Sequence, residues 1–314
     1  MMGVFCGALL GAAAWGRSWI LEESAPIQLG SRPAILSRLE GIRGERPLSF
    51  AVVGDSHGSA VFNEILKKLK EEKLDFIVHL GDFAPAPDER GHRLFMAQVK
   101  ENLGPQAPPM LLVMGNHDVD RGFPVQAFEE LYEPSTYSFQ VGGNLFLVVR
   151  NCLPRSLRDR AEAATKGWGH EVRRTLQERG GSAKRTFLFM HAPPLDPLAD
   201  IQGSRARRFR SAWGDLGVDY LVAGHLHQYS RMNMGSSVLL ISGGGGGTLR
   251  SVRSGRFHHA VIMRLDGDRI TEELVTVRDP WEAIPWRLRR RTVVGIYRLL
   301  SLWRGGPLGE EGLS

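Results

Sequence analysis

The feature that most constrains this chain is a set of five short apolar runs, each followed by residues of types that bind metals. With their polar ends, the runs are Ser49–His57, Asp75–Asp82, Met110–Asp118, Thr186–His191 and Val218–His227. Short runs rich in Val, Phe and Ile are typical of β-strands buried on both faces. If the strands are parallel, their carboxyl ends lie along one edge, where open α/β sheets hold their ligands. One strand that ends in Asp or His can occur by chance, whereas five such strands in one chain indicate a binding site.

Length and composition set broad limits on the protein class. The chain has 314 residues, enough for one large domain or two small ones, and 42% of them are hydrophobic. Its two cysteines, Cys6 and Cys152, cannot form a disulfide framework or a zinc site of four cysteines. The formal net charge is +6, but six arginines and no acidic residue lie between Trp286 and Arg304. The rest of the chain is near neutral, so we do not expect nucleic acid as a partner.

The first 47 residues divide into two segments. Residues 1–21 contain one charged side chain, Arg17, and fit an uncleaved membrane anchor, a cleaved signal or a helix packed on the protein. We favour the anchor, because the segment is just long enough to span and lacks the positive start of a signal peptide. Residues 22–47 carry Pro and Gly at intervals that predict a linker.

Residues 48–278 form the main domain in our interpretation. Apolar side chains at helical spacing predict helices over Ser59–Lys73, Gly91–Asn102, Pro124–Glu133, Lys166–Arg179 and Ser204–Trp213. Hairpins are expected where turn residues separate Tyr137–Val141 from Leu145–Arg150 and Val261–Leu265 from Arg269–Val277. The mixture of βα units and hairpins predicts an α/β fold with two β-sheets packed face to face and helices outside.

The polar residues at the strand ends have the chemistry of a metal site. Asp55 and His57 lie two apart, as do His225 and His227, and in an extended backbone such pairs project to the same side. Asp82 stands alone, which suits a carboxylate that bridges two cations. A glycine precedes four of these polar ends and allows the chain to turn tightly off its strand. Mixed nitrogen and oxygen ligands favour Mn, Fe, Zn or Ni over calcium.

Each of these features alone has a simpler explanation. A Gly-Asp or Gly-His after a strand is more often a turn or a helix cap, and Asn116-His117-Asp118 is compatible with an ordinary loop. The convergence of all of them at strand ends favours a metal site.

Taken together, these residues resemble a known family. Asp55-Ser-His57, Gly81-Asp82, Gly115-Asn116-His117-Asp118, His191 and Gly224-His225-Leu-His227 are similar to the ordered signature of the calcineurin-like metallophosphoesterases. The resemblance covers roughly residues 48–247 and implies a four-layer αββα sandwich, with two mixed sheets flanked by helices. It also implies two divalent metal ions, Mn, Fe or Zn.

The resemblance assigns a role to each position. One metal would take Asp55, His57 and His227, and the other Asn116, His191 and His225, with Asp82 as the bridge. His117 would be the catalytic residue that assists the leaving group, and Asp118 would support the ligands from a second shell. No residue is predicted to bind the rest of the substrate.

The implied activity is hydrolysis of a phosphate ester by a hydroxide held between the two metals. The alternatives are a phosphodiesterase or pyrophosphatase on nucleotide- or lipid-linked substrates, a nuclease, and a non-catalytic scaffold with the same fold. Pro85 stands where purple acid phosphatases carry a tyrosine that binds ferric iron, so that chemistry is not expected.

Other motifs are weaker. We interpret the arginines within 205–210 as a solvated helix face, Gly243–Gly247 as a flexible loop near the site, and His79 as a core histidine. His258-His259 is expected to be structural, and Cys152 inert.

The C-terminal extension 279–314 is rich in Arg and Trp. Its stretch Trp286–Trp303 interleaves Arg with apolar residues and resembles an amphipathic helix on an anionic membrane, or a helix docked on the catalytic domain. We therefore expect a membrane-associated protein, on the exported or periplasmic side, with the cytoplasmic face as the alternative. The expected partner is a phosphorylated substrate.

Overall fold

The computed structural model describes residues 28–152, 168–194, 217–249 and 255–279. No helix in these ranges has the length and apolar character needed to cross a membrane. The predicted segment 1–21, the helix over 204–213 with its arginines, and the extension beyond residue 279 lie outside the described residues.

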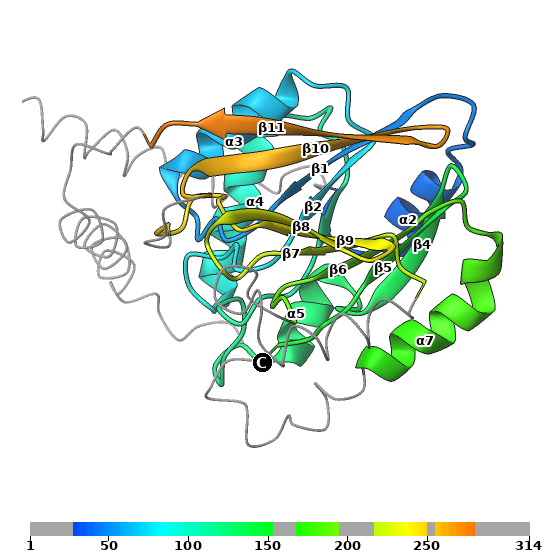
Figure 1. The fold of residues 1–314 in the computed structure, drawn as a ribbon. Helices are drawn as coiled ribbons and strands as arrows, with labels where there is room; N and C mark the ends of the chain where they lie inside the picture. Colours follow the sequence, from blue (N-terminus) through cyan, green and yellow to red (C-terminus); the bar gives the residue numbers. More distant parts are fainter. Residues whose placement is uncertain (1–27, 153–167, 195–216, 250–254, 280–314) are drawn as a thin grey trace, which may run out of the picture. The chain divides into compact units, whose positions relative to one another are not determined.

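The first β-sheet has five strands in the order β11-β10-β1-β2-β3, of which β11, β10, β1 and β2 are labelled in Figure 1. These strands are β1 (Leu48–Val53), β2 (Phe76–His79), β3 (Met110–Leu112), β10 (His258–Asp266) and β11 (Arg269–Val277). Strands β1, β2 and β3 are parallel, whereas β10 and β11 form the predicted hairpin and pair antiparallel to β1. The carboxyl ends of three of the five predicted runs therefore share one edge of this sheet.

The second β-sheet has six strands in the order β4-β5-β6-β7-β9-β8. They are β4 (Tyr137–Val141), β5 (Asn144–Val148), β6 (Thr186–Met190), β7 (Tyr220–Ala223), β8 (Tyr229–Met234) and β9 (Ser237–Ser242). The hairpin β4–β5 is as predicted, and β5, β6, β7 and β9 are parallel. Strands β8 and β9 were not predicted, because polar residues interrupt β8 in sequence.

The two sheets face each other across an aromatic core. Alternation along each strand sends every second side chain inward, so Phe50 of β1 meets Phe146, Phe187 and Phe189 of the opposite sheet edge to face. All four rings are fully buried. The core holds the sheets together and places their carboxyl edges opposite each other.

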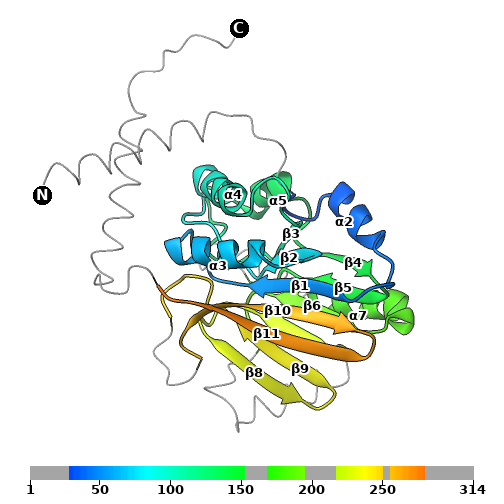
Figure 2. The ribbon, with the colours of Figure 1, turned by 90° about the horizontal axis from the view of Figure 1, so that it is seen from above.

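Helices cover the two outer faces (Figure 2). Helices α3 (Ala60–Lys70), α4 (Glu89–Leu103) and α5 (Val125–Tyr132) pack on the first sheet. Helix α7 (Trp168–Arg179), followed by the short 3₁₀ helix η2 (Gly180–Ser182), packs on the second. The predicted four-layer αββα sandwich is confirmed.

Two expectations need correction. The five runs do not share a single edge, since β1, β2 and β3 lie in one sheet and β6 and β7 in the other. The segment expected to be a linker contains helix α2 (Pro33–Glu40), whose Ile35 and Leu39 are buried in the core between the sheets. A proline in the first turn and two apolar residues one turn apart signal this short helix.

Candidate metal centre

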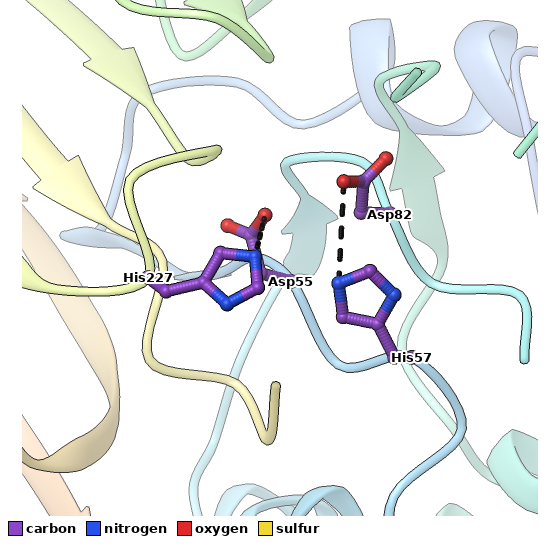
Figure 3. Close-up of side chains that lie close together, drawn as sticks. All are labelled: Asp55, His57, Asp82 and His227. Carbon is purple, nitrogen blue, oxygen red and sulfur yellow. Dashed lines mark ion pairs between the residues drawn. The ribbon is translucent and has the colours of Figure 1, made fainter. Parts of the chain in front are cut away.

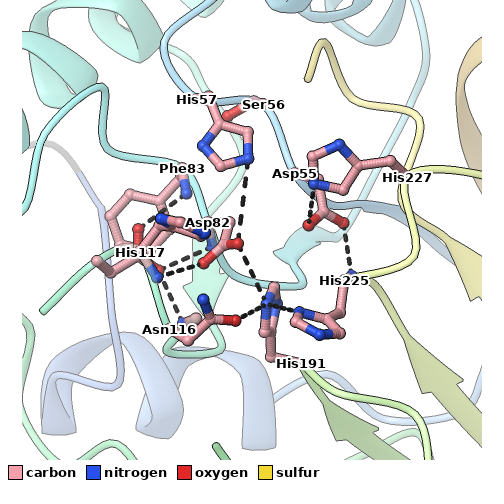
Figure 4. Close-up of polar contacts among 12 residues, drawn as sticks. Asp55, Ser56, His57, Asp82, Phe83, Asn116, His117, His191, His225 and His227 are labelled. Carbon is pink, nitrogen blue, oxygen red and sulfur yellow. Dashed lines mark hydrogen bonds and ion pairs between the residues drawn. The ribbon is translucent and has the colours of Figure 1, made fainter. Parts of the chain in front are cut away.

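The predicted ligands meet where the carboxyl edges of the two sheets face each other (Figure 4). Loops after β1, β2 and β3 bring Asp55, His57, Asp82 and Asn116 from the first sheet. Loops after β6 and β7 bring His191, His225 and His227 from the second. The structure thus gathers side chains that are up to 172 residues apart in the chain, from Asp55 to His227.

The side chains form two groups that could each hold a metal ion. The first contains Asp55, His57, Asp82 and His227, and the second contains Asp82, His191 and His225. Within each group the ligand atoms lie within 4.8 Å of one another. Asp82 belongs to both groups, as a bridging carboxylate must (Figure 3 shows the first group).

The second group is the tighter of the two. Nε2 of His191 lies 3.3 Å from Oδ2 of Asp82, 3.2 Å from Oδ1 of Asn116 and 3.1 Å from Nδ1 of His225. Nδ1 of His191 donates to the carbonyl oxygen of Leu80 at 2.8 Å, which places the lone pair of the neutral ring on Nε2. Ligands about 2.1 Å from one ion are about 3.4 Å apart in a tetrahedral arrangement. The donor set and its spacing therefore fit a cation.

Asp55 also fits a cation in the first group. The carboxylate is fully buried, and Oδ2 accepts a hydrogen bond from the backbone N–H of His225 at 2.8 Å. Oδ1 accepts no hydrogen bond and lies 3.4 Å from Nε2 of His227. Burial raises the pKa of Asp55 well above its ordinary value, although the charge on His191 opposes this. A cation beside Oδ1 would stabilise the charged form of this carboxylate.

The electrostatics of His57, His225 and His227 favour metal binding. Burial lowers the pKa of His57 and of His225 to about 4, and it also lowers the pKa of His227. These imidazoles are therefore neutral at physiological pH, as metal ligands must be. Burial opposes the charged form of Asp82, but the neighbouring His191, His57 and His117 lower its pKa overall. Burial likewise disfavours charge on His191, yet the Asp82 carboxylate raises its pKa well above the ordinary value.

The backbone at the ligands is unusual. Among the residues that the structure describes, non-glycine residues with positive φ include Asp55 (61°), His57 (47°), Asp82 (56°), His225 (66°) and His227 (49°). The left-handed region costs non-glycine residues about 1–3 kcal/mol each and persists where the surroundings impose it, typically at functional sites. This corrects the expectation of an extended backbone, although His225 and His227 still face the same site and enter the different ligand groups that the resemblance implies.

Asp118 acts on the ligands through the backbone. Its Oδ2 accepts from the N–H groups of Asp82 at 2.9 Å and Gly115 at 2.8 Å. Its Oδ1 accepts from Phe83 at 2.9 Å and Ala84 at 3.1 Å. Burial raises the pKa of Asp118 to about 7, whereas the N–H donors from Ala84 and Gly115 favour its charged form. One carboxylate thus ties the loop after β2 to the loop after β3.

His117 lies at the rim of the site. Its side chain is exposed, and its ring centroid is 5.5 Å from that of His57. Its backbone N–H donates to Oδ1 of Asp82 at 2.7 Å, so the shared carboxylate fixes its place. The ring is free to meet a ligand that approaches from solvent.

Comparison with known proteins gives the family. The model of the calcineurin-like phosphoesterase family matches residues 48–229. The chain belongs to the calcineurin-like phosphoesterase family. No curated protein matches the chain.

Solved structures with this fold include an anchor protein and a phosphatase. GAP50, the anchor in the inner membrane complex of Plasmodium, is 15% identical with a TM-score of 0.57, covering 73% of this chain and 84% of that one. Purple acid phosphatase PPD1 from yellow lupin (Lupinus luteus) seeds is 16% identical with a TM-score of 0.55, covering 74% of this chain and 52% of that one. The match thus spans about half of the lupin enzyme. At these identities the likeness shows the fold alone, and an anchor and a phosphatase share it.

Within this member of the family, the glycine run 243–247 packs against the site. The N–H of Gly245 donates to the carbonyl of Gly54 at 2.8 Å, and that of Gly247 to the carbonyl of Asp55 at 2.7 Å. A Cβ on Gly243 would lie 2.8 Å from Oδ2 of Asp55. The expectation of a plain flexible loop is wrong, because the run pairs with the strand end that carries Asp55.

Several side chains behave as expected. His79 is fully buried among Phe62, Phe83 and Phe95. Its Nε2 lies 3.0 Å from Oγ of Ser56, the residue between two ligands. Burial raises the pKa of the Cys152 thiol to about 11, in keeping with an inert cysteine.

Sequence reasoning missed two residues beside the site, the buried His92 and the half-buried Asn151. His92 of α4 binds the carbonyl of Asp118, and Asn151 after β5 binds the backbone of Ala192. Asn151 had a readable signal: it follows a sixth apolar run, Leu145–Val149, at the carboxyl end of its strand. His92 had none, because its partner is 26 residues away.

A surface hollow lies away from this centre. It has a volume of about 570 Å³ and is lined by residues that include Arg38, Arg46, Lys70 and Lys73, none of them a predicted ligand. Arg46 forms an ion pair with Asp75, and both residues line the hollow. Its lining includes the residues that precede β1, β2 and β3, at the sheet edge opposite the metal centre.

Proposed function

We propose that this chain is a metal-dependent phosphoesterase that hydrolyses a phosphate ester at a centre of two divalent cations, Mn, Fe or Zn. The observation that carries the proposal is that Asp82 belongs to both ligand groups. Asp55, His57 and His227 would hold one cation, and Asn116, His191 and His225 the other, with Asp82 between them. When bound, such cations supply a hydroxide nucleophile near neutral pH and neutralise charge on the phosphate.

The chain's own residues perform the remaining steps. The loops after five strands fix the ligands, and Asp118 holds two of those loops through four backbone N–H groups. The exposed His117 at the rim donates a proton to the departing oxygen, a role that is typically worth about 10²–10⁴-fold in rate. Its backbone N–H is anchored to Asp82, and its side chain is exposed to solvent.

A scaffold with the same fold is the alternative outside enzymes. A scaffold needs neither a complete ligand set nor an exposed histidine beside it. The chain has both, with neutral imidazoles on His57, His225 and His227 and, within the described ranges, a buried carboxylate oxygen on Asp55 that accepts no hydrogen bond. These features favour catalysis over a purely structural role.

The test combines metal analysis with two model substrates. We expect about two equivalents of Mn²⁺ per chain, turnover of p-nitrophenyl phosphate or bis-p-nitrophenyl phosphate, and loss of turnover after chelation. A preference for the diester would favour the phosphodiesterase, pyrophosphatase or nuclease alternatives. A wild-type protein that binds no metal and turns over neither substrate would leave only the scaffold.

His117→Ala separates the proton donor from the ligands. The variant should keep its metal content, because His117 belongs to neither ligand group. Its kcat should fall by about 10²–10⁴-fold. A variant that keeps full activity would refute the assigned role.

We also propose that the protein is attached to a membrane by residues 1–21, on the exported side. The support is the apolar composition of this segment and the Arg- and Trp-rich extension. Replacing Leu9 and Leu10 by arginine in the full chain should move it from the membrane pellet to the supernatant. Unchanged sedimentation after a carbonate wash would contradict the proposal.

A further inference from the structure

The second sheet carries a polar residue beside the centre that the ligand set does not use. Strand β5 runs parallel to β6, with Val148 opposite Phe189. The chain continues past β5, where the N–H of Val149 donates to the carbonyl of Phe189 at 3.0 Å. Asn151 therefore arrives beside the loop that carries His191, at the same carboxyl edge.

The amide of Asn151 pairs with both polar groups of one peptide residue. Its Nδ2 donates to the carbonyl of Ala192 at 2.5 Å, and its Oδ1 accepts from the N–H of Ala192 at 3.2 Å. Nδ2 also lies 3.3 Å from Sδ of Met190. Asn151 thus contacts the residues on both sides of His191. A short side chain that both donates and accepts is required for this pairing, and an amide meets that need.

His191 depends on accurate placement. It is fully buried, with Nδ1 bound to the carbonyl of Leu80 and Nε2 facing Asp82, Asn116 and His225. Two fixed points, the Leu80 carbonyl and the backbone on its carboxyl side, define the direction of its lone pair. Outer partners of metal ligands typically change metal affinity or activity by about 10–100-fold when they are removed.

We propose that Asn151 is a positioning residue that fixes His191 for its cation through the backbone of Ala192. This inference rests on the proposed function, since it assigns His191 to a metal. It concerns one ligand group, because the hydrogen bonds of Asn151 within the described part of the chain are to the residues on either side of His191. The group of Asp55, His57 and His227 lies outside its reach, which gives the inference a specific signature.

The test uses Asn151→Ala with Asn144→Ala as the matched control. Asn144 is buried at the other end of β5, and its Nδ2 donates to the carbonyls of Val141 at 3.2 Å and Gly142 at 3.4 Å. Both variants lose a side-chain amide that binds backbone groups, one at the start of β5 and one just after its end, so both should lose thermal stability. Of the two asparagines, Asn151 is the one that contacts the residues next to a predicted metal ligand.

The readout is an Mn²⁺ binding isotherm of the purified full chain, with kcat and KM at saturating Mn²⁺. For Asn151→Ala we expect one of two sites to weaken by about 10–100-fold and kcat to fall more than KM changes. Asn144→Ala should bind both ions like the wild type. Asn151→Asp, which keeps the volume but loses the donor, should weaken the same site and serves if the alanine variant does not fold.

The outcomes separate the two proposals. If Asn151→Ala and Asn151→Asp bind both ions as the wild type does, the positioning role is refuted. Equal weakening in Asn144→Ala would also refute it, since the effect would then be general destabilisation. If the wild type itself binds no Mn²⁺, the proposed function fails instead.

Discussion

At the scale of single residues, the centre depends on backbone conformations that side chains rarely adopt. Five predicted ligands have positive φ, and the chain tolerates these positions because neighbouring loops impose them. Such residues turn sharply off a strand end, which lets two histidines only two residues apart serve different ligand groups. The centre also requires the backbones of neighbouring loops to approach each other closely, which glycine allows because it has no Cβ.

Gly115→Ala tests that close approach. A Cβ at Gly115 would lie 2.2 Å from the backbone nitrogen of Asp82, and neither loop can yield without moving the shared carboxylate. We expect loss of Mn²⁺ binding at both groups and a fall in the free energy of unfolding of about 1–3 kcal/mol. Titration with Mn²⁺ and urea denaturation measure the two effects.

Gly181→Ala is the control for Gly115→Ala. A Cβ at Gly181 meets nothing within 4 Å. This variant should bind metal like the wild type, within error. Wild-type metal binding by Gly115→Ala would contradict the packing argument.

At the scale of elements, helix α4 supports a loop of the centre. Nε2 of His92 donates to the carbonyl of Asp118 at 2.8 Å, and Nδ1 lies 3.1 Å from the hydroxyl of Tyr132 on α5. Because a carbonyl only accepts, the proton is on Nε2 and the tyrosine hydroxyl donates to Nδ1. His92 also stacks on Phe123, with ring centroids 4.4 Å apart. Two helices thus determine where the loop of Asn116 and His117 lies.

His92→Phe tests this support. The substitution keeps an aromatic ring against Phe123 but leaves the buried carbonyl of Asp118 without its donor, which costs about 1–3 kcal/mol. We expect lower stability and a lower kcat, with KM less affected, in urea denaturation and steady-state assays.

Tyr132→Phe provides the comparison. It removes the hydroxyl on the far side of the same imidazole and leaves the bond to Asp118 in place. We expect a loss of about 1 kcal/mol and a kcat close to that of the wild type. Equal kcat losses in both variants would show that the loss does not arise from the hydrogen bond between His92 and Asp118.

At the scale of the whole molecule, buried neutral histidines make stability depend on pH. Burial lowers the pKa of His92 and of His259 to about 4, from an ordinary value of about 6.5. The unfolded chain therefore binds protons between these values while the folded chain does not, so stability falls as the pH falls from about 6.5 to 4. The maximum effect is about 3 kcal/mol for each histidine.

His259→Phe isolates one of these contributions. The ring would still pack against Tyr229 and Phe257, whose centroids lie 5.4 Å and 5.0 Å from that of His259. We expect a smaller loss of unfolding free energy between pH 7 and pH 5 than in the wild type, measured by urea denaturation with chelator present. An unchanged slope would show that His259 does not titrate in this window.

The sequence by itself determined the strand runs, the residue types at their ends and the family. Those properties are local: the period of apolar residues, the glycines and the order of the motifs are readable along the chain. It therefore predicted all seven ligand positions as candidates, together with the hairpins β4–β5 and β10–β11 and the four layers.

Only the tertiary structure decided how these parts combine. The division of the runs between two sheets and the supports from Asn151 and His92 depend on contacts between distant segments. No local pattern encodes them, because they arise when the aromatic core brings two carboxyl edges face to face. The left-handed backbone at five ligands has the same origin, since the surrounding loops impose a conformation that the isolated residues disfavour.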